Sequence, residues 1–143
     1  MKRTAFFGLL LLSAAGCNKD RAAQRDLKGI WTVTAQYKIS GTDTLDMLAG
    51  YEITYQFDEC YQWSGHDDLC QGVITTTSSA DTITTTQDFE YLAGDEGTTL
   101  MFTFYDPSNG VYTDMPSVID ELTESSLKFT LTGTPAIVVE AAK

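Results

Sequence analysis

Basic residues are almost absent from the middle of this 143-residue chain, because no Lys or Arg occurs between Ile39 and Leu127. The same stretch contains seventeen Asp and Glu residues. A surface of that sign repels phosphate backbones, so we predict no binding to nucleic acid. Acidity of this kind more often serves solubility and charge repulsion than the binding of a cationic partner or Ca²⁺.

Histidine is also scarce, and this limits the chemistry that the chain can perform. The one His, His66, stands before Asp67 and Asp68 in a polar segment typical of an exposed hairpin tip. A zinc site there would need carboxylates alone to complete it, and no spacing resembles a calcium loop. No G-x-S-x-G motif is present, and no pair of carboxylates stands out as a glycosidase acid and base. We therefore predict no enzyme, no metal site and no cofactor.

Long apolar runs are confined to the N-terminus, where Ala5 to Leu12 (AFFGLLLL) follow the basic residues Lys2 and Arg3. Small residues (SAAG) come next and end directly at Cys17. A spanning helix is the alternative, but so short a run would not cross a hydrocarbon layer of roughly 30 Å. The order resembles the lipobox of bacterial lipoproteins, with Ala14 where Leu is usual. It predicts a cleaved signal peptide over residues 1–16 and acylation of Cys17 with palmitate and further chains.

Removal of the signal peptide would leave 127 residues, the size of one domain, with a net charge of −13. Residues 17–26 are polar and include three basic side chains, so we predict that they form a flexible tether beside the membrane. Asn18 rather than Asp follows Cys17, which favours the outer membrane over the inner one. Whether the domain faces the periplasm or the exterior stays open.

From residue 27 to residue 143 the hydrophobic period is two, which predicts antiparallel strands that cover one core. The first strand, residues 29–39, places five apolar side chains on one face: Trp31, Val33, Ala35, Tyr37 and Ile39. The same alternation recurs in later segments, with these inward-facing residues: Tyr51, Ile53, Tyr55, Phe57; Ile83, Phe89, Tyr91; Leu100, Phe102, Phe104; Leu127, Phe129, Leu131.

Turn residues separate these strands at short intervals, which predicts an up-and-down meander of about eight strands. Closure into a barrel would remove the exposed edges. The last apolar run, Ala136 to Glu140, is expected to pair with the first strand and close the barrel. Thr44 to Leu48 is the one segment for which we expect a helical turn.

The start of the first strand, Leu27 to Trp31 (LKGIW), resembles the G-x-W signature of lipocalin-like barrels. Residues 55–59 (YQFDE) and 119–129 (IDELTESSLKF) are similar to parts of lipocalin-like lipoproteins from Bacteroidota-type bacteria. The resemblance implies an eight-stranded barrel in which Trp31 packs under one end and Gly29 allows close backbone approach. Typical lipocalins stack a late Arg on this Trp. Here Lys128 is the one cation that we place near it.

Cys60 and Cys70 are the two thiols that remain once Cys17 is acylated, and an exported domain meets an oxidising compartment. If they pair, Ser64-Gly65-His66 becomes a three-residue hairpin loop. We therefore predict a disulfide, over two free thiols or a redox pair. A redox motif would place the cysteines two residues apart beside a helix.

The predicted function is non-catalytic. Fourteen aromatic residues follow the signal peptide, and we expect their rings to fill the barrel rather than leave a large pocket. The leading hypothesis is a monomeric, lipid-anchored envelope protein that binds a small apolar molecule or presents its loops. The alternative is a protein-binding module such as an envelope protease inhibitor, which would need an exposed apolar tip. The hairpin with Trp63 is the nearest candidate for one.

Overall fold

The computed structural model describes residues 16–60 and 70–143. In this part the chain forms one helix, a short 3-10 turn and nine strands, as follows: α1 (Gly16–Leu27), β1 (Gly29–Ser40), β2 (Asp43–Asp46), β3 (Tyr51–Phe57), β4 (Cys70–Ser78), β5 (Thr84–Gly94), η1 (Asp95–Gly97), β6 (Thr99–Asp106), β7 (Val111–Leu122), β8 (Ser126–Leu131) and β9 (Ala136–Ala142). No helix among these residues is long and apolar enough to cross a membrane.

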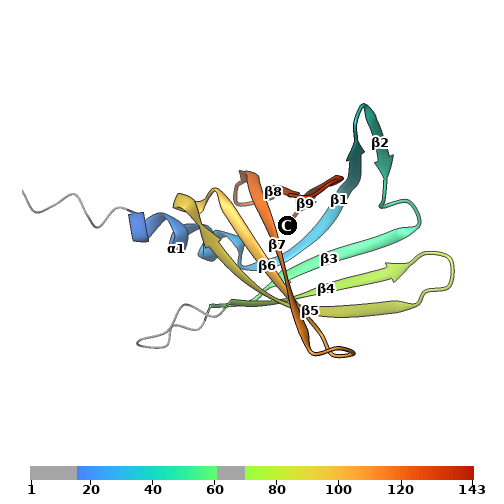
Figure 1. Ribbon diagram of the computed structural model, residues 1–143, viewed down its shortest axis with the longest axis horizontal. Coiled ribbons are helices and arrows are strands. Elements are labelled where there is room, and N and C mark those ends of the chain that lie inside the picture. Colours follow the sequence, from blue (N-terminus) through green and yellow to red (C-terminus); the bar gives the residue numbers. More distant parts are fainter. Residues whose placement is uncertain (1–15, 61–69) are drawn as a thin grey trace, which may run out of the picture.

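The strands form a closed antiparallel barrel (Figure 1). Each strand from β3 to β8 pairs with the next, β1 pairs with β3, and β9 returns to pair with β1. The β1–β9 ladder runs from Ile39 opposite Ala136 to Thr32 opposite Ala142. The expected all-β barrel and its closure by the C-terminal segment are both confirmed.

Strand β2 corrects the helical turn that we expected over Thr44 to Leu48. Asp43–Asp46 pair with Tyr37–Ser40 of β1 in a hairpin, on the side of β1 that β9 does not occupy. Gly41 has a φ of +63° in the turn, a conformation that Gly adopts without steric cost. The segment TLD has no clear hydrophobic period of its own and is held as a strand by its pairing with β1.

The barrel narrows to eight strands at one end and splits at the other. β1 pairs with β3 through Gly29–Thr32, while its outer half pairs with β2 instead. In Figure 1, β2 projects away from the β4–β5 hairpin at this end. Leu48, in the connection from β2 to β3, packs against the core. We call this split end the open end, and the end beside α1 the closed end.

Helix α1 corrects the expected flexible tether over residues 17–26. Ala23, Gln24 and Leu27 are buried, and the Asp20 carboxylate accepts a hydrogen bond of 2.8 Å from the backbone N–H of Gly97. These residues recur at intervals of three and four and therefore share one helix face. Only two of the buried side chains are apolar, so the sequence gives no helical hydrophobic period. The helix packs on the closed end through Leu27, which joins the core, and through the hydrogen bond between Asp20 and Gly97.

The core contains most of the inward faces that the alternation predicted, but it does not contain Ala35, Tyr37, Ile39 or Tyr51. A register shift between Val33 and Ala35 reverses the faces of β1 beyond that point, which takes its later apolar residues off the inward face. Ile39 is 38% exposed and Tyr51, at the start of β3, is 50% exposed. Trp31, Leu100 and Phe129 are fully buried, and the rest of the set is as follows: Leu27, Val33, Tyr55, Phe57, Cys70, Phe89, Tyr91, Phe102, Leu127, Val139 and Ala141. Ile83 was assigned to this face wrongly, because it precedes β5 and is 58% exposed. The backbone N–H of Ile83 donates a hydrogen bond of 3.2 Å to Oδ1 of Asp81, which holds Ile83 in a turn.

Candidate binding site

Aromatic rings fill the middle of the barrel. Tyr55 lies at the centre of the cluster, with its ring centroid 5.6 Å from Phe129 and 6.2 Å from Phe102. Phe57 and Phe89 extend the cluster, at 5.5 Å from one another. Burial raises the pKa of Tyr55 to about 12, because the phenolate would be formed away from water. This packing agrees with the expected aromatic core, so a binding site has to be sought toward the open end.

Trp31 seals the closed end, as the G-x-W resemblance implied. Its indole N–H donates a hydrogen bond of 2.6 Å to the carbonyl of Leu27. The ammonium of Lys143 lies 4.5 Å from the ring centroid, a cation–π distance. Gly29 has a φ of +129°, and a Cβ there would stand 2.9 Å from Cε of Lys143. Gly29 therefore gives room for the lysine that covers Trp31.

Lys128 is not the cation on Trp31 that we expected. Its ammonium lies 2.9 Å from the Glu140 carboxylate, and this contact raises the pKa of Lys128. Lys143 takes the place on Trp31 because β9 runs beside β1 and returns the C-terminus to the closed end. The sequence could have predicted this position of Lys143. Extending the expected pairing of the last segment with the first strand to the end of the chain places Lys143 near Trp31.

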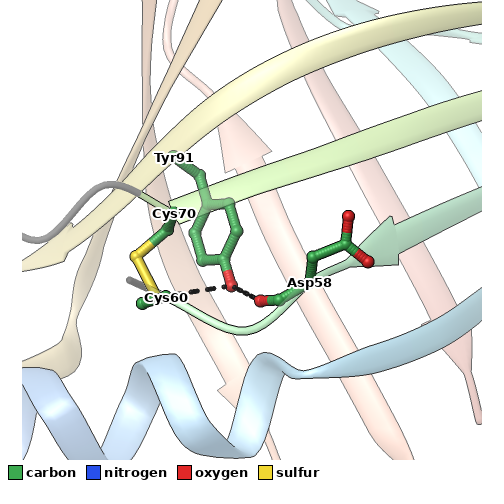
Figure 2. The surroundings of a disulfide bond; sticks show 4 residues. All are labelled: Asp58, Cys60, Cys70 and Tyr91. Atoms are coloured by element: carbon green, nitrogen blue, oxygen red, sulfur yellow. Dashed lines mark hydrogen bonds between the residues drawn. A yellow bond between two sulfur atoms is a disulfide. The ribbon is translucent and has the colours of Figure 1, made fainter. Parts of the chain in front are cut away.

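The predicted disulfide is present between Cys60 and Cys70 (Figure 2). The Tyr91 hydroxyl donates a hydrogen bond of 2.7 Å to the Asp58 carbonyl, and Sγ of Cys60 lies 3.7 Å from the same hydroxyl oxygen. Burial and the Asp58 carboxylate raise the pKa of Tyr91 to about 12. Closing so short a loop contributes about 2–3 kcal/mol to stability. The disulfide and the Tyr91–Asp58 hydrogen bond together tie the segment after β3 to β4 and β5. We therefore assign them a structural role.

A cleft opens where β5 and β6 separate. Their ladder ends with Phe89 opposite Phe104. Beyond it, among the described strands, Thr84–Asp88 pair with β4 and Tyr105 and Asp106 pair with β7. The resulting hollow has a volume of about 760 Å³, and we call it the β5–β6 cleft. Its walls are Thr86, Gln87, Asp88, Phe104, Tyr105, Asp106, Pro107, Thr113 and Met115. The volume is in the range of sites for small molecules.

A second hollow, the outer groove, lies on the outside of the same strands. It has a volume of about 380 Å³ and is lined by Asp58, Gln71, Gly72, Val73, Asp88, Phe89, Glu90, Thr103, Tyr105 and Tyr112. Asp88 and Tyr105 belong to both hollows. The two therefore meet at the edge where the sheet divides.

The charge around both hollows has a single sign. Four of their lining residues are acidic, namely Asp58, Asp88, Glu90 and Asp106, and none is basic. The nearest cations in sequence are Lys38 and Lys128, outside the whole segment that builds the hollows. The site combines apolar and aromatic walls with uncompensated carboxylates.

The structure brings together some of the predicted site residues and leaves others apart. Gly29 and Trp31 lie at the closed end, and Cys60 and Cys70 lie beside the outer groove through Asp58. The backbone of Cys17 is in the first turn of α1. The expected hairpin tip with Trp63, His66, Asp67 and Asp68 lies outside the described residues. Within residues 16–60 and 70–143, no three His, Cys, Asp or Glu side chains are placed to hold a metal ion.

The architecture defines a class: a small antiparallel barrel, consistent with a lipocalin-like fold, with one end covered by a helix and a cleft at the other. In sequence, the chain matches no protein-family model and no curated protein.

Proposed function

We propose that this protein is a lipid-anchored lipoprotein of the bacterial outer envelope that binds a small, largely apolar molecule without catalysis. The observation that carries the binding role is the β5–β6 cleft at the open end. Phe104, Pro107 and Met115 supply its apolar surface, and Gln87 and Thr113 supply hydrogen-bonding groups. A few polar groups in a mainly apolar hollow are typical of sites that fix the orientation of a small ligand.

The proposed anchor rests on the order of basic, apolar and small residues before Cys17. Its place in the fold suits the binding role, because α1 packs on the closed end, opposite the β4–β5 hairpin of the open end (Figure 1). Acyl chains on Cys17 would hold the closed end toward the bilayer. The cleft would then face away from the lipid and be accessible to ligands from the aqueous side.

We expect replacement of Cys17 to abolish lipid attachment. Cells that express the wild type should incorporate radiolabelled palmitate into the protein, and cells that express Cys17→Ser should not. The double variant Cys60→Ser/Cys70→Ser is the matched control and should retain the label, since the disulfide cysteines take no acyl chain. Equal labelling of the wild type and Cys17→Ser would contradict the lipoprotein assignment.

We expect the protein to retain a small hydrophobic molecule when it is purified from its host, visible by native mass spectrometry as an added mass. Met115→Glu should lose that mass, because it places a charge in the cleft without a partner. Met101→Glu is the control, since Met101 is 38% exposed and is not part of the cleft. Loss of the mass in both variants, or its absence from the wild type, would contradict the binding role. A co-purified protein would support the protein-binding alternative.

A further inference from the structure

We propose that the ligand is an amphipathic organic cation, with its apolar body in the β5–β6 cleft and its positively charged head in the outer groove. This inference rests on the proposed function and adds the chemical class of the ligand. The head would lie against Asp88, Glu90 and the ring pair of Tyr105 and Tyr112. The two hollows share the lining residues Asp88 and Tyr105, so we place one molecule across both.

The register of the strands gathers these side chains on one outer face. Phe89 and Tyr91 are buried, so Asp88 and Glu90, which alternate with them on β5, point outward. Glu90 pairs with Thr103, which in turn pairs with Asp114. The next outward position of β6 is Tyr105, which pairs with Tyr112. Two carboxylates on β5 therefore face a pair of rings on β6 and β7 across the dividing edge.

The two rings are placed as an aromatic surface rather than as core. Their centroids are 5.0 Å apart with an interplanar angle of 44°. Tyr105 is 50% exposed and Tyr112 is 63% exposed, whereas Tyr55 and Tyr91 are buried. Aromatic faces attract organic cations, and the attraction strengthens when carboxylates lie beside the rings. The Tyr105–Tyr112 ring pair can therefore make a cation–π contact with a positively charged head, and a neutral or anionic head makes no such contact.

The carboxylates have no cation of their own. Within residues 16–60 and 70–143, neither Asp88 nor Glu90 has an ion-pair partner. Asp114 differs, since it accepts a hydrogen bond of 2.7 Å from the Thr103 hydroxyl. Asp58 is also bonded, to the Gln56 amide at 2.8 Å. Asp88 and Glu90 are therefore the carboxylates of the groove that a cationic ligand can neutralise. Their negative charge repels an anionic head.

Three probes with the same ten-carbon chain test the proposal: decyltrimethylammonium, decyl maltoside and decyl sulfate. Each is titrated calorimetrically below its micelle concentration into the mature chain carrying Cys17→Ser, which has no acyl chain to absorb the probe. We expect the cation to bind about tenfold more tightly than the neutral probe. We expect no detectable binding of the anion.

The double variant Asp88→Asn/Glu90→Gln removes the two charges and keeps the shapes of the side chains. It should bind the cation about as weakly as the neutral probe and leave the neutral probe unchanged. The matched control is Asp43→Asn/Glu52→Gln, which removes two exposed carboxylates of β2 and β3 and should bind like the wild type. The double variant Tyr105→Ala/Tyr112→Ala should lower the affinity for the cation more than the affinity for the neutral probe.

The outcomes separate the two proposals. Equal binding of all three probes, lost in Met115→Glu, would keep the proposed function and overturn the cationic ligand. An equal loss of cation affinity in the test variant and in the control would overturn it as well, since it would show attraction to net charge alone. Absence of binding by every probe would overturn both proposals.

Discussion

Deleting residues 134–143 is expected to unfold the barrel rather than trim its end. The deletion removes β9, which pairs with β8 on one side and with β1 on the other. It also removes Val139 and Ala141 from the core and Lys143 from the face of Trp31. Two strand edges and the apolar interior would then face water. The loss in free energy of unfolding should exceed the ~5–15 kcal/mol that a typical domain has in total.

Thermal unfolding followed by circular dichroism, together with size-exclusion chromatography, measures this effect. The truncated chain should show no cooperative transition and should aggregate. Deletion of Lys143 alone is the control, because it removes the cation–π contact and leaves the β9 ladders in place. The free energy of unfolding of that variant should be lower by about 1 kcal/mol than that of the full chain. A truncated protein that stays monomeric with the melting temperature of the full chain would contradict closure of the barrel by β9.

Replacing Gly72 with Ala should destabilise the protein by about 2–3 kcal/mol, because the added methyl group has no room. Gly72 lies in the middle of the sheet, between Phe57 of β3 and Phe89 of β5. A Cβ there would overlap the Phe89 ring and stand 2.5 Å from the carbonyl oxygen of Gln56. The ring could rotate only into its aromatic neighbours, and the carbonyl is fixed by the backbone.

Urea denaturation gives the free energy of unfolding for this comparison. Gly133→Ala is the matched control, since a Cβ there meets its nearest atom, the Pro135 carbonyl oxygen, at 3.4 Å. It should change the stability by less than about 1 kcal/mol. If Gly72→Ala is as stable as Gly133→Ala, then Phe89 does not pack over Gly72 as described.

The sequence was sufficient to predict the barrel because its signal is local and repeated. Alternation placed Trp31, Phe102 and Phe129 on inward faces, and the structure buries all three. Pairing of Ala136 to Glu140 with the first strand followed from the need to close the sheet. The Cys60–Cys70 disulfide followed from spacing and compartment, and the structure contains it.

The features that sequence reasoning missed depend on contacts between distant segments. Helix α1 has two buried apolar side chains, and its position depends on Gly97, more than seventy residues away. The β5–β6 cleft exists because a ladder ends at Phe89 and Phe104, and no residue type marks where a ladder ends. One part of the site was within reach. A four-residue turn over 107–110 places Asp106 opposite Val111 and therefore Tyr105 opposite Tyr112.

The pairing of the first strand with the last has a consequence for the order of events during synthesis. A chain made from its N-terminus can form the β3–β4 and β6–β7 hairpins early, because their partners are close in sequence. The β1–β9 ladder joins residues about a hundred positions apart, so it forms only after the final strand has been made. Until then β1 presents an unpaired edge and Trp31 lacks its cover of Lys143. The nascent protein is therefore most exposed to misassembly in the interval just before its last ten residues appear.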